Sequence, residues 1–350
     1  MDAHAKNTVS AKYVSYIEET RALYTEELAT LPPAMREIAL RRISVRTKRA
    51  NGRQLLGECA PWLIADLLGI ADVPAIRRLA LSWLHVYFFV LMVDDLVDKP
   101  RDTIHPQDMI VGSLLFQRGL HALVRGGLCE EGLDAAFLET ANAGLREVQG
   151  WRQRIQSFAP TPEMIGQKLS LLRICARALM SLVNGRASAS PSLDELLNQI
   201  GIGIQLLDDL TDLEEDFRAG QLSYPFQLAL RRSQALANDF QSSRFGSDTL
   251  LLLLESGSLV ETLQAATNAF SRALVEVQSA VPNVSNSSRL YIEALHHATQ
   301  CALDKIQSAQ IELTRIDVDH FVKDESLRSA QRIRIAEDVK ESLEVVAQSS

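Results

Sequence analysis

Apolar side chains recur every three to four residues along most of the chain, and no run alternates apolar and polar positions as a half-buried strand would. The pattern therefore predicts helices throughout. Prolines mark the ends of these helices, because nearly all of them fall where the apolar period breaks. Pro61 alone lies within an apolar stretch, and we expect it in the first turn of a helix. The predicted helices cover residues 10–30, 33–50, 61–68, 74–98, 107–125, 130–157, 162–184, 193–217, 221–241, 259–280, 289–315 and 325–346.

No linker rich in glycine or proline divides the chain, and no repeat is evident beyond two short acidic motifs. We therefore predict a single all-α domain over residues 1–350, with residues 1–8 as a flexible N-terminus. The longest apolar run contains Ser82 and His85 and is too short to cross a bilayer comfortably. Because the first residues also lack the apolar core of a signal peptide, we expect a cytoplasmic protein without integral membrane association.

The two acidic motifs both read D-D-x-x-D, and each closes a long apolar stretch. They comprise Asp94, Asp95 and Asp98, then Asp208, Asp209 and Asp212, with Asp216 one turn further along. Residues three and four apart share a helix face, so the carboxylates of each motif can converge. Such clusters are costly at the end of an apolar helix unless a cation binds them. A single motif also occurs on solvated helix faces, but two copies predict a site for Mg²⁺ and a diphosphate carried on an apolar chain.

The composition narrows the class of partner. The 350 residues are 47% hydrophobic and 23% charged, as in an ordinary globular protein. A formal net charge of −8 argues against a nucleic-acid partner. The four cysteines are scattered without the spacing of a zinc site, a pattern typical of reduced thiols rather than of a disulfide framework.

In their order along the chain, these features resemble the trans-isoprenyl diphosphate synthase and class I terpene synthase superfamily. The segment 51–53 (Asn-Gly-Arg) is similar to the family's substrate-binding Gly-Lys-Arg segment. Lys168 takes the place of a diphosphate-binding lysine, and Gln205 precedes the second acidic motif by three positions. The segment 220–225 resembles the family's Gly-Lys-x-Thr-x-Pro. The resemblance implies a class I isoprenoid (terpenoid) synthase helical bundle around a central apolar pocket, with three Mg²⁺ ions and a diphosphate at its mouth.

The resemblance also assigns roles to individual residues. Both acidic motifs become metal ligands and catalytic residues, and Lys168, with Arg53 and Arg173, would stabilise the charge that develops on the leaving diphosphate. Tyr87 and Phe89 lie one to two turns before the first motif, where aromatic faces can stabilise a carbocation. We expect Phe89 to line the pocket and limit its depth. Plain core packing is the alternative for this aromatic run.

The departures from the family bear on the reaction. The elongating enzymes place two adjacent arginines shortly after the first motif, whereas residues 99–102 read Lys-Pro-Arg-Asp. The family's Gly-Lys-Arg-x-Arg segment becomes Gly-Arg-Gln-Leu-Leu at residues 52–56, which loses two basic positions, and Gln221 stands where the family has a lysine. These basic groups would bind the second substrate, isopentenyl diphosphate, and neutral replacements remove charge-assisted hydrogen bonds to phosphate.

The second motif also partly fits the metal triad of the terpene cyclases, with Asp208, Asp212 and Asp216 at four-residue spacing. The sequence therefore favours a Mg²⁺-dependent terpene synthase that ionises a C10–C20 allylic prenyl diphosphate and releases diphosphate. A trans-prenyltransferase that condenses this substrate with isopentenyl diphosphate is the alternative. A non-catalytic synthase-like subunit is disfavoured by the intact motifs. Product skeleton and oligomeric state stay open, although homodimers are frequent among the resembling enzymes.

Overall fold

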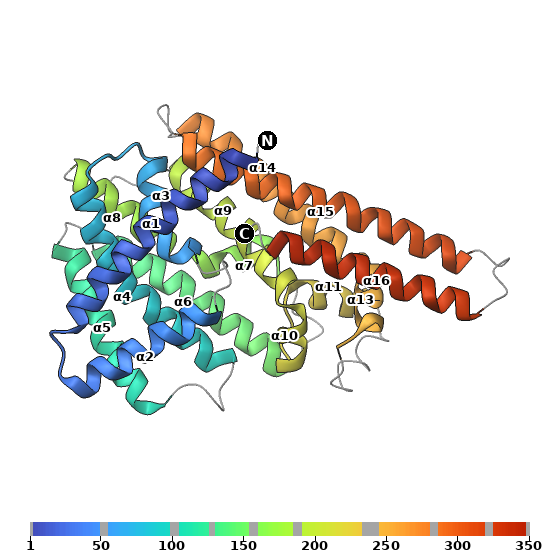
Figure 1. The fold of residues 1–350 in the computed structure, drawn as a ribbon, viewed down its shortest axis with the longest axis horizontal. Helices are drawn as coiled ribbons and strands as arrows, with labels where there is room; N and C mark the ends of the chain where they lie inside the picture. Colours follow the sequence, from blue (N-terminus) through green and yellow to red (C-terminus); the bar gives the residue numbers. More distant parts are fainter. Residues whose placement is uncertain are drawn as a thin grey trace. The chain divides into compact units, whose positions relative to one another are not determined.

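The computed structural model describes residues 3–49, 55–98, 105–125, 130–153, 160–184, 191–232, 245–280, 286–318 and 325–347. Every regular element in these ranges is a helix, which confirms the all-α prediction (Figure 1). The helices are α1 (Ala3–Leu28), α2 (Pro33–Arg49), α3 (Leu55–Leu67), α4 (Val73–Asp98), α5 (Pro106–Arg125), α6 (Glu130–Gln153), α7 (Pro162–Gly166), the 3-10 helix η1 (Gln167–Leu169), α8 (Leu172–Asn184), α9 (Pro191–Thr211), α10 (Leu213–Ala219), α11 (Tyr224–Arg232), α13 (Ser247–Glu255), α14 (Ser258–Ala280), α15 (Asn286–Val318) and α16 (Glu325–Ala347).

Two predicted helices are divided in the structure. The helix predicted over 162–184 becomes α7, η1 and α8, because Gly166 is a poor helix former and the chain tightens into a 3-10 turn after it. The helix predicted over 193–217 is interrupted at Asp212, a residue type that favours the N-cap.

Two further differences concern a helix that begins earlier than predicted and a helix that was not predicted. Helix α1 begins at Ala3, inside the segment expected to be a flexible tail, since no proline or glycine interrupts it. The sequence pattern does not predict α13, because its five consecutive leucines (250–254) show no helical period.

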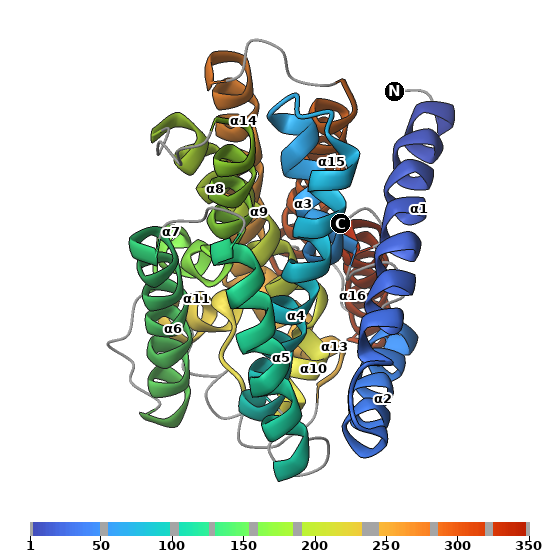
Figure 2. The same cartoon turned by 90° about the vertical axis from the view of Figure 1, so that its left-hand side faces the viewer.

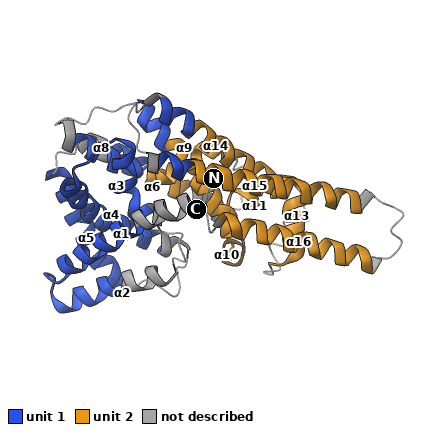
Figure 3. Cartoon of the chain, turned by 45° about the horizontal axis from the view of Figure 1, so that its top comes forward, with its two compact units in different colours: residues 1–139, 170–197, 274–292 blue, residues 140–169, 198–273, 293–350 orange. Residues whose placement is uncertain are grey.

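The contacts divide the chain into two compact units (Figure 3). Unit 1 comprises residues 1–139, 170–197 and 274–292, and unit 2 comprises residues 140–169, 198–273 and 293–350. The single domain expected over the whole chain stays a prediction.

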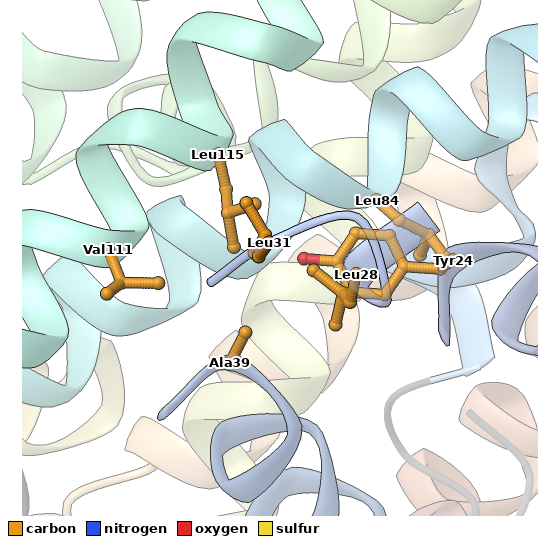
Figure 4. Packing of buried hydrophobic residues seen from close by; sticks show 7 residues of the cluster. All are labelled: Tyr24, Leu28, Leu31, Ala39, Leu84, Val111 and Leu115. Atoms are coloured by element: carbon orange, nitrogen blue, oxygen red, sulfur yellow. The ribbon is translucent and has the colours of Figure 1, made fainter. Parts of the chain in front are cut away.

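The core of unit 1 is built around α4, which packs against α1, α3, α5 and α8. Figure 2 shows α4 and α5 side by side. One buried cluster joins α1 and α2 to this pair of helices (Figure 4). Its members are Tyr24, Leu28, Leu31, Ala39, Leu84, Val111 and Leu115, all at most 6% exposed. Because this apolar surface is removed from water, the cluster fixes the first two helices onto α4 and α5.

Helix α4 contains a long apolar segment. By length and composition, its segment Val73–Val93 could span a membrane, a test that core helices also pass. Here Trp83, Leu84 and Val86 are buried against other helices of unit 1. The run is apolar on most sides because several helices surround it.

The expectation that Pro61 occupies a first helical turn is wrong, because α3 begins at Leu55 and Pro61 lies in its interior. Proline has no N–H, so the carbonyl of Gly57, four residues earlier, loses its helical donor. The indole N–H of Trp83 in α4 donates to this carbonyl at 2.6 Å. A side chain at Gly57 would also collide with Tyr87, since a Cβ there would lie 2.1 Å from the ring. Pro61 frees a carbonyl that Trp83 of α4 can bind, and Gly57 leaves space for the Tyr87 ring of α4. Both residues therefore allow α4 to pack closely against α3.

Candidate functional site

The first acidic motif lies at the C-terminal end of α4, in unit 1. The backbone of Asp94, Asp95 and Asp98 is helical, as the sequence predicts. Their side chains lie outside the part of the chain whose side chains are described, so their role as metal ligands stays a prediction.

The second acidic motif lies where α9 passes into α10, in unit 2. Asp208 and Asp209 occupy the last turn of α9, and Asp212 is the N-cap of α10. Helical hydrogen bonds continue across the break: Asp212 N–H donates to the Asp208 carbonyl at 3.0 Å, and Asp216 N–H donates to the Asp212 carbonyl at 2.8 Å. The acidic side chains therefore stay on consecutive turns despite the interruption.

Asp209 is a buried carboxylate of this motif and is only 6% exposed. One oxygen accepts the backbone N–H of Tyr224 at 2.9 Å. The other accepts the Gln205 side-chain amide at 3.2 Å, and the same amide lies 3.3 Å from an Asp208 oxygen. Gln205, a predicted substrate-binding residue, therefore orients two acidic side chains of the motif.

The contact from Tyr224 depends on the turn after α10. Gly220 ends this helix with φ of 72°, a left-handed conformation that glycine adopts without strain. The following residue, Gln221, donates its N–H to the Asp216 carbonyl at 2.8 Å. The chain thereby reverses and brings the Tyr224 N–H to Asp209.

The carboxylates of the second motif repel one another. Burial, and then the charge of Asp209, raise the pKa of Asp216 to about 9, and Asp212 and Asp208 add to the rise. The Ser223 hydroxyl lowers this pKa by approaching the carboxyl, although the contact does not have the geometry of a full hydrogen bond. Without a cation, Asp216 therefore holds a proton at neutral pH, and a bound divalent ion would relieve the repulsion.

The repulsion among these carboxylates favours the binding of a cation. Carboxylate oxygens are hard ligands of the kind that Mg²⁺ prefers. Among the described side chains, no three from histidine, cysteine, aspartate and glutamate lie close enough to hold an ion by themselves. Magnesium, and the number of ions, therefore stay predictions.

A pocket of roughly 390 Å³, which includes space open to solvent, adjoins Asp209 within unit 2. It is lined by Ala143, Arg146, Pro160, Met164, Ile165, Lys168, Asp209, Leu222, Ser223, Tyr224 and Gln227. The structure thus brings the predicted Lys168 to the same pocket as the second motif. The motifs do not predict Arg146 or the backbone of Tyr224 at this site, since a helical arginine and a backbone amide carry no sequence signal of their own.

Lys168 reaches this pocket because α7 approaches α9 closely. A Cβ at Gly166 would lie 2.4 Å from the Ile202 side chain and 3.1 Å from its backbone. Only glycine permits this approach, which places η1 and its lysine against the helix that carries Asp209.

The other predicted site residues belong to unit 1. Arg53 lies outside the described residues. Arg173 is in unit 1 and forms an ion pair of 2.7 Å with Glu139. Phe89 is half-buried with its ring 4.7 Å from that of Phe116 in α5, and Tyr87 packs against Trp83 with ring centroids 6.1 Å apart. Their roles in substrate binding stay predictions.

The helices have the same fold as solved prenyl diphosphate synthases, which is the fold that the sequence resemblance implies. A geranylgeranyl pyrophosphate synthetase from Pyrococcus horikoshii matches with a TM-score of 0.62 and 17% identity, covering 84% of this chain and 98% of that one. A heptaprenyl diphosphate synthase from Staphylococcus aureus matches with a TM-score of 0.62 and 14% identity, covering 82% and 97%.

A polyprenyl synthase from Caulobacter crescentus, solved with calcium and isoprenyl diphosphate, has a TM-score of 0.58 and 18% identity, with 83% and 96% of the two chains covered. No protein-family model matches the sequence, and no curated protein is similar to it at a significant level. At these identities, the likeness establishes the fold.

Proposed function

We propose that this protein is a metal-dependent isoprenoid synthase that acts on an allylic prenyl diphosphate, and that it works as a trans-prenyltransferase. The observation that carries the proposal is Asp209, a buried carboxylate oriented by Gln205 and Tyr224 in a pocket shared with Lys168. The preference for a transferase over the cyclase favoured by the sequence is supported by the similar solved structures reported above, which are prenyl diphosphate synthases by name.

In this proposal, each acidic motif binds Mg²⁺, and the ion at the second motif would supply Lewis-acid activation of the diphosphate. Neighbouring residues hold the second motif in position before an ion binds. Gln205 and the Tyr224 N–H fix both oxygens of Asp209, so little reorganisation is needed to accept a ligand. Lys168 contributes a positive charge that opposes the negative charge of the leaving diphosphate.

A terpene cyclase is the second candidate, and Gln221 favours it. This residue stands where the family has a lysine and is only 8% exposed, so a neutral amide fills a buried position. Losing that cation weakens the case for a second diphosphate substrate.

The deciding experiment incubates the purified protein with Mg²⁺ and C10, C15 or C20 allylic diphosphates, with and without isopentenyl diphosphate. The transferase is supported by a longer prenyl diphosphate that forms only with isopentenyl diphosphate. Hydrocarbons or alcohols formed from the allylic substrate alone would establish the cyclase. Absence of diphosphate release from every substrate, with the protein folded, would overturn both.

A further inference from the structure

The pocket of unit 2 contains a second cation, Arg146 of α6, which the family motifs do not predict. Other arginines of this unit are engaged in ion pairs with glutamates: Arg218 with Glu214, Arg232 with Glu261, Arg332 with Glu255 and Arg334 with Glu312. No hydrogen bond or ion pair joins Arg146 to another residue that the structure describes. Arg146 is exposed, so a ligand in solvent can approach it.

The charge of the lining favours an anion. Of the lining side chains, Arg146 and Lys168 are cationic and only Asp209 is anionic. Asp209 accepts hydrogen bonds from Gln205 and from the Tyr224 backbone. Among the side chains that line the pocket, the two positive charges therefore outnumber the single negative one.

The uncharged lining divides into a polar part and an apolar part. The polar part is formed by Ser223, Tyr224 and Gln227. The apolar part consists of Ala143, Pro160, Met164, Ile165 and Leu222. A ligand with a phosphate head and a hydrocarbon tail matches this combination of surfaces.

Arginine is better suited than lysine to bind a phosphate group. A guanidinium presents its donors in a planar fork that fits two phosphate oxygens, whereas lysine offers a single point charge. Arg146 of α6 and Lys168 of η1 would both contact the phosphate.

We propose that Arg146 is a phosphate-binding residue of this pocket and that, with Lys168, it holds the diphosphate head of the prenyl substrate. The identity of the substrate rests on the proposed function, whereas the binding of diphosphate does not. Because the head group is common to all chain lengths, Arg146 contributes equally to the binding of each.

The test compares R146Q with R334Q, which removes an exposed arginine of the same unit that is paired with Glu312. Both variants lose one positive charge, and both should keep the wild-type circular dichroism. Titration calorimetry with inorganic diphosphate in excess Mg²⁺ should give a dissociation constant about tenfold to a hundredfold higher for R146Q, the loss expected for a charged hydrogen bond. R334Q should bind as the wild type does, and R146K should recover part of the affinity.

Steady-state kinetics on C10, C15 and C20 substrates complete the test. R146Q should raise KM by the same factor for all three. Equal diphosphate binding by R146Q and R334Q, with prenyl turnover intact in the wild type, would overturn the role of Arg146 and leave the proposed function standing. Loss of binding in R146Q, with no prenyl diphosphate turned over by the wild type, would support Arg146 and overturn the proposed function.

Discussion

The carboxylate of Asp209 accepts the backbone N–H of Tyr224 at 2.9 Å, fifteen residues further along the chain. This bond ties the end of α9 to the beginning of α11 around the turn at Gly220. Asp209 therefore has a structural role in addition to its predicted role as a metal ligand, and the two roles can be separated by substitution.

Asp209→Asn should retain most of the stability and lose most of the prenyl-diphosphate turnover. An amide oxygen can still accept the Tyr224 N–H, but it lacks the charge that a divalent cation needs. Asp209→Ala should lose turnover and also about 1–3 kcal/mol of stability, because the buried N–H loses its partner. Urea unfolding and diphosphate-release assays on both variants check this, and equal stability of the two would contradict the structural role.

Asp216→Asn should be stabilised relative to the wild type as the pH rises. The folded-state pKa of about 9 lies above the ordinary value of 3.8, so the folded protein holds a proton that the unfolded chain releases. The corresponding stability is present in full below the unfolded pKa and is lost as the pH rises through the folded pKa. Asparagine cannot ionise and avoids this loss.

Denaturant midpoints measured without metal at pH 5 and pH 9 provide the comparison for Asp216. The difference between variant and wild type should shift in favour of the variant at the higher pH. Asp304→Asn, which changes an exposed aspartate of α15, serves as the control. Parallel pH profiles for all three proteins would refute the raised pKa.

Magnesium binding at pH 7 should release about one proton per protein, because a carboxyl must ionise before it can bind a cation. Calorimetric titrations in two buffers of different ionisation enthalpy measure this number directly. Asp216→Asn should abolish the release. Proton release unchanged in that variant would assign it to another group.

Phe89→Ala should move the substrate preference toward a longer prenyl chain if Phe89 lines the pocket. Fully buried phenylalanines cost about 3–5 kcal/mol on truncation to alanine, and the half-buried Phe89 should cost less. Phe116→Ala is the matched control, since the two rings pack together at 4.7 Å. The ratio of kcat/KM for C20 and C15 substrates should change in the Phe89 variant alone; equal loss of stability with unchanged ratios in both would indicate core packing.

Sequence reasoning succeeded where side-chain type and spacing carry the information. The apolar period located most helices, and the acidic motifs lie at the helix ends where the pattern puts them. Gln205 lies beside the second motif because three positions make nearly one helical turn. These features are local, so the chain encodes them within a few residues.

The missed features depend on contacts between distant segments. The Tyr224 N–H at Asp209 is a backbone group, and every non-proline residue has one. The interior position of Pro61 is tolerated because a donor on another helix satisfies the freed carbonyl. Arg146 looks like any solvated helical arginine until the pocket beside it is known.

The bond from Trp83 to Gly57 also has a consequence for the way unit 1 unfolds. The Gly57 carbonyl of α3 has no donor within its own helix and accepts instead from Trp83, which lies 26 positions later. If α4 separates from α3, the Gly57 carbonyl loses its hydrogen bond and Gly57 loses its close contact with Tyr87. The two helices should therefore open as one cooperative unit in amide hydrogen exchange, with α3 protected only for as long as α4 stays docked.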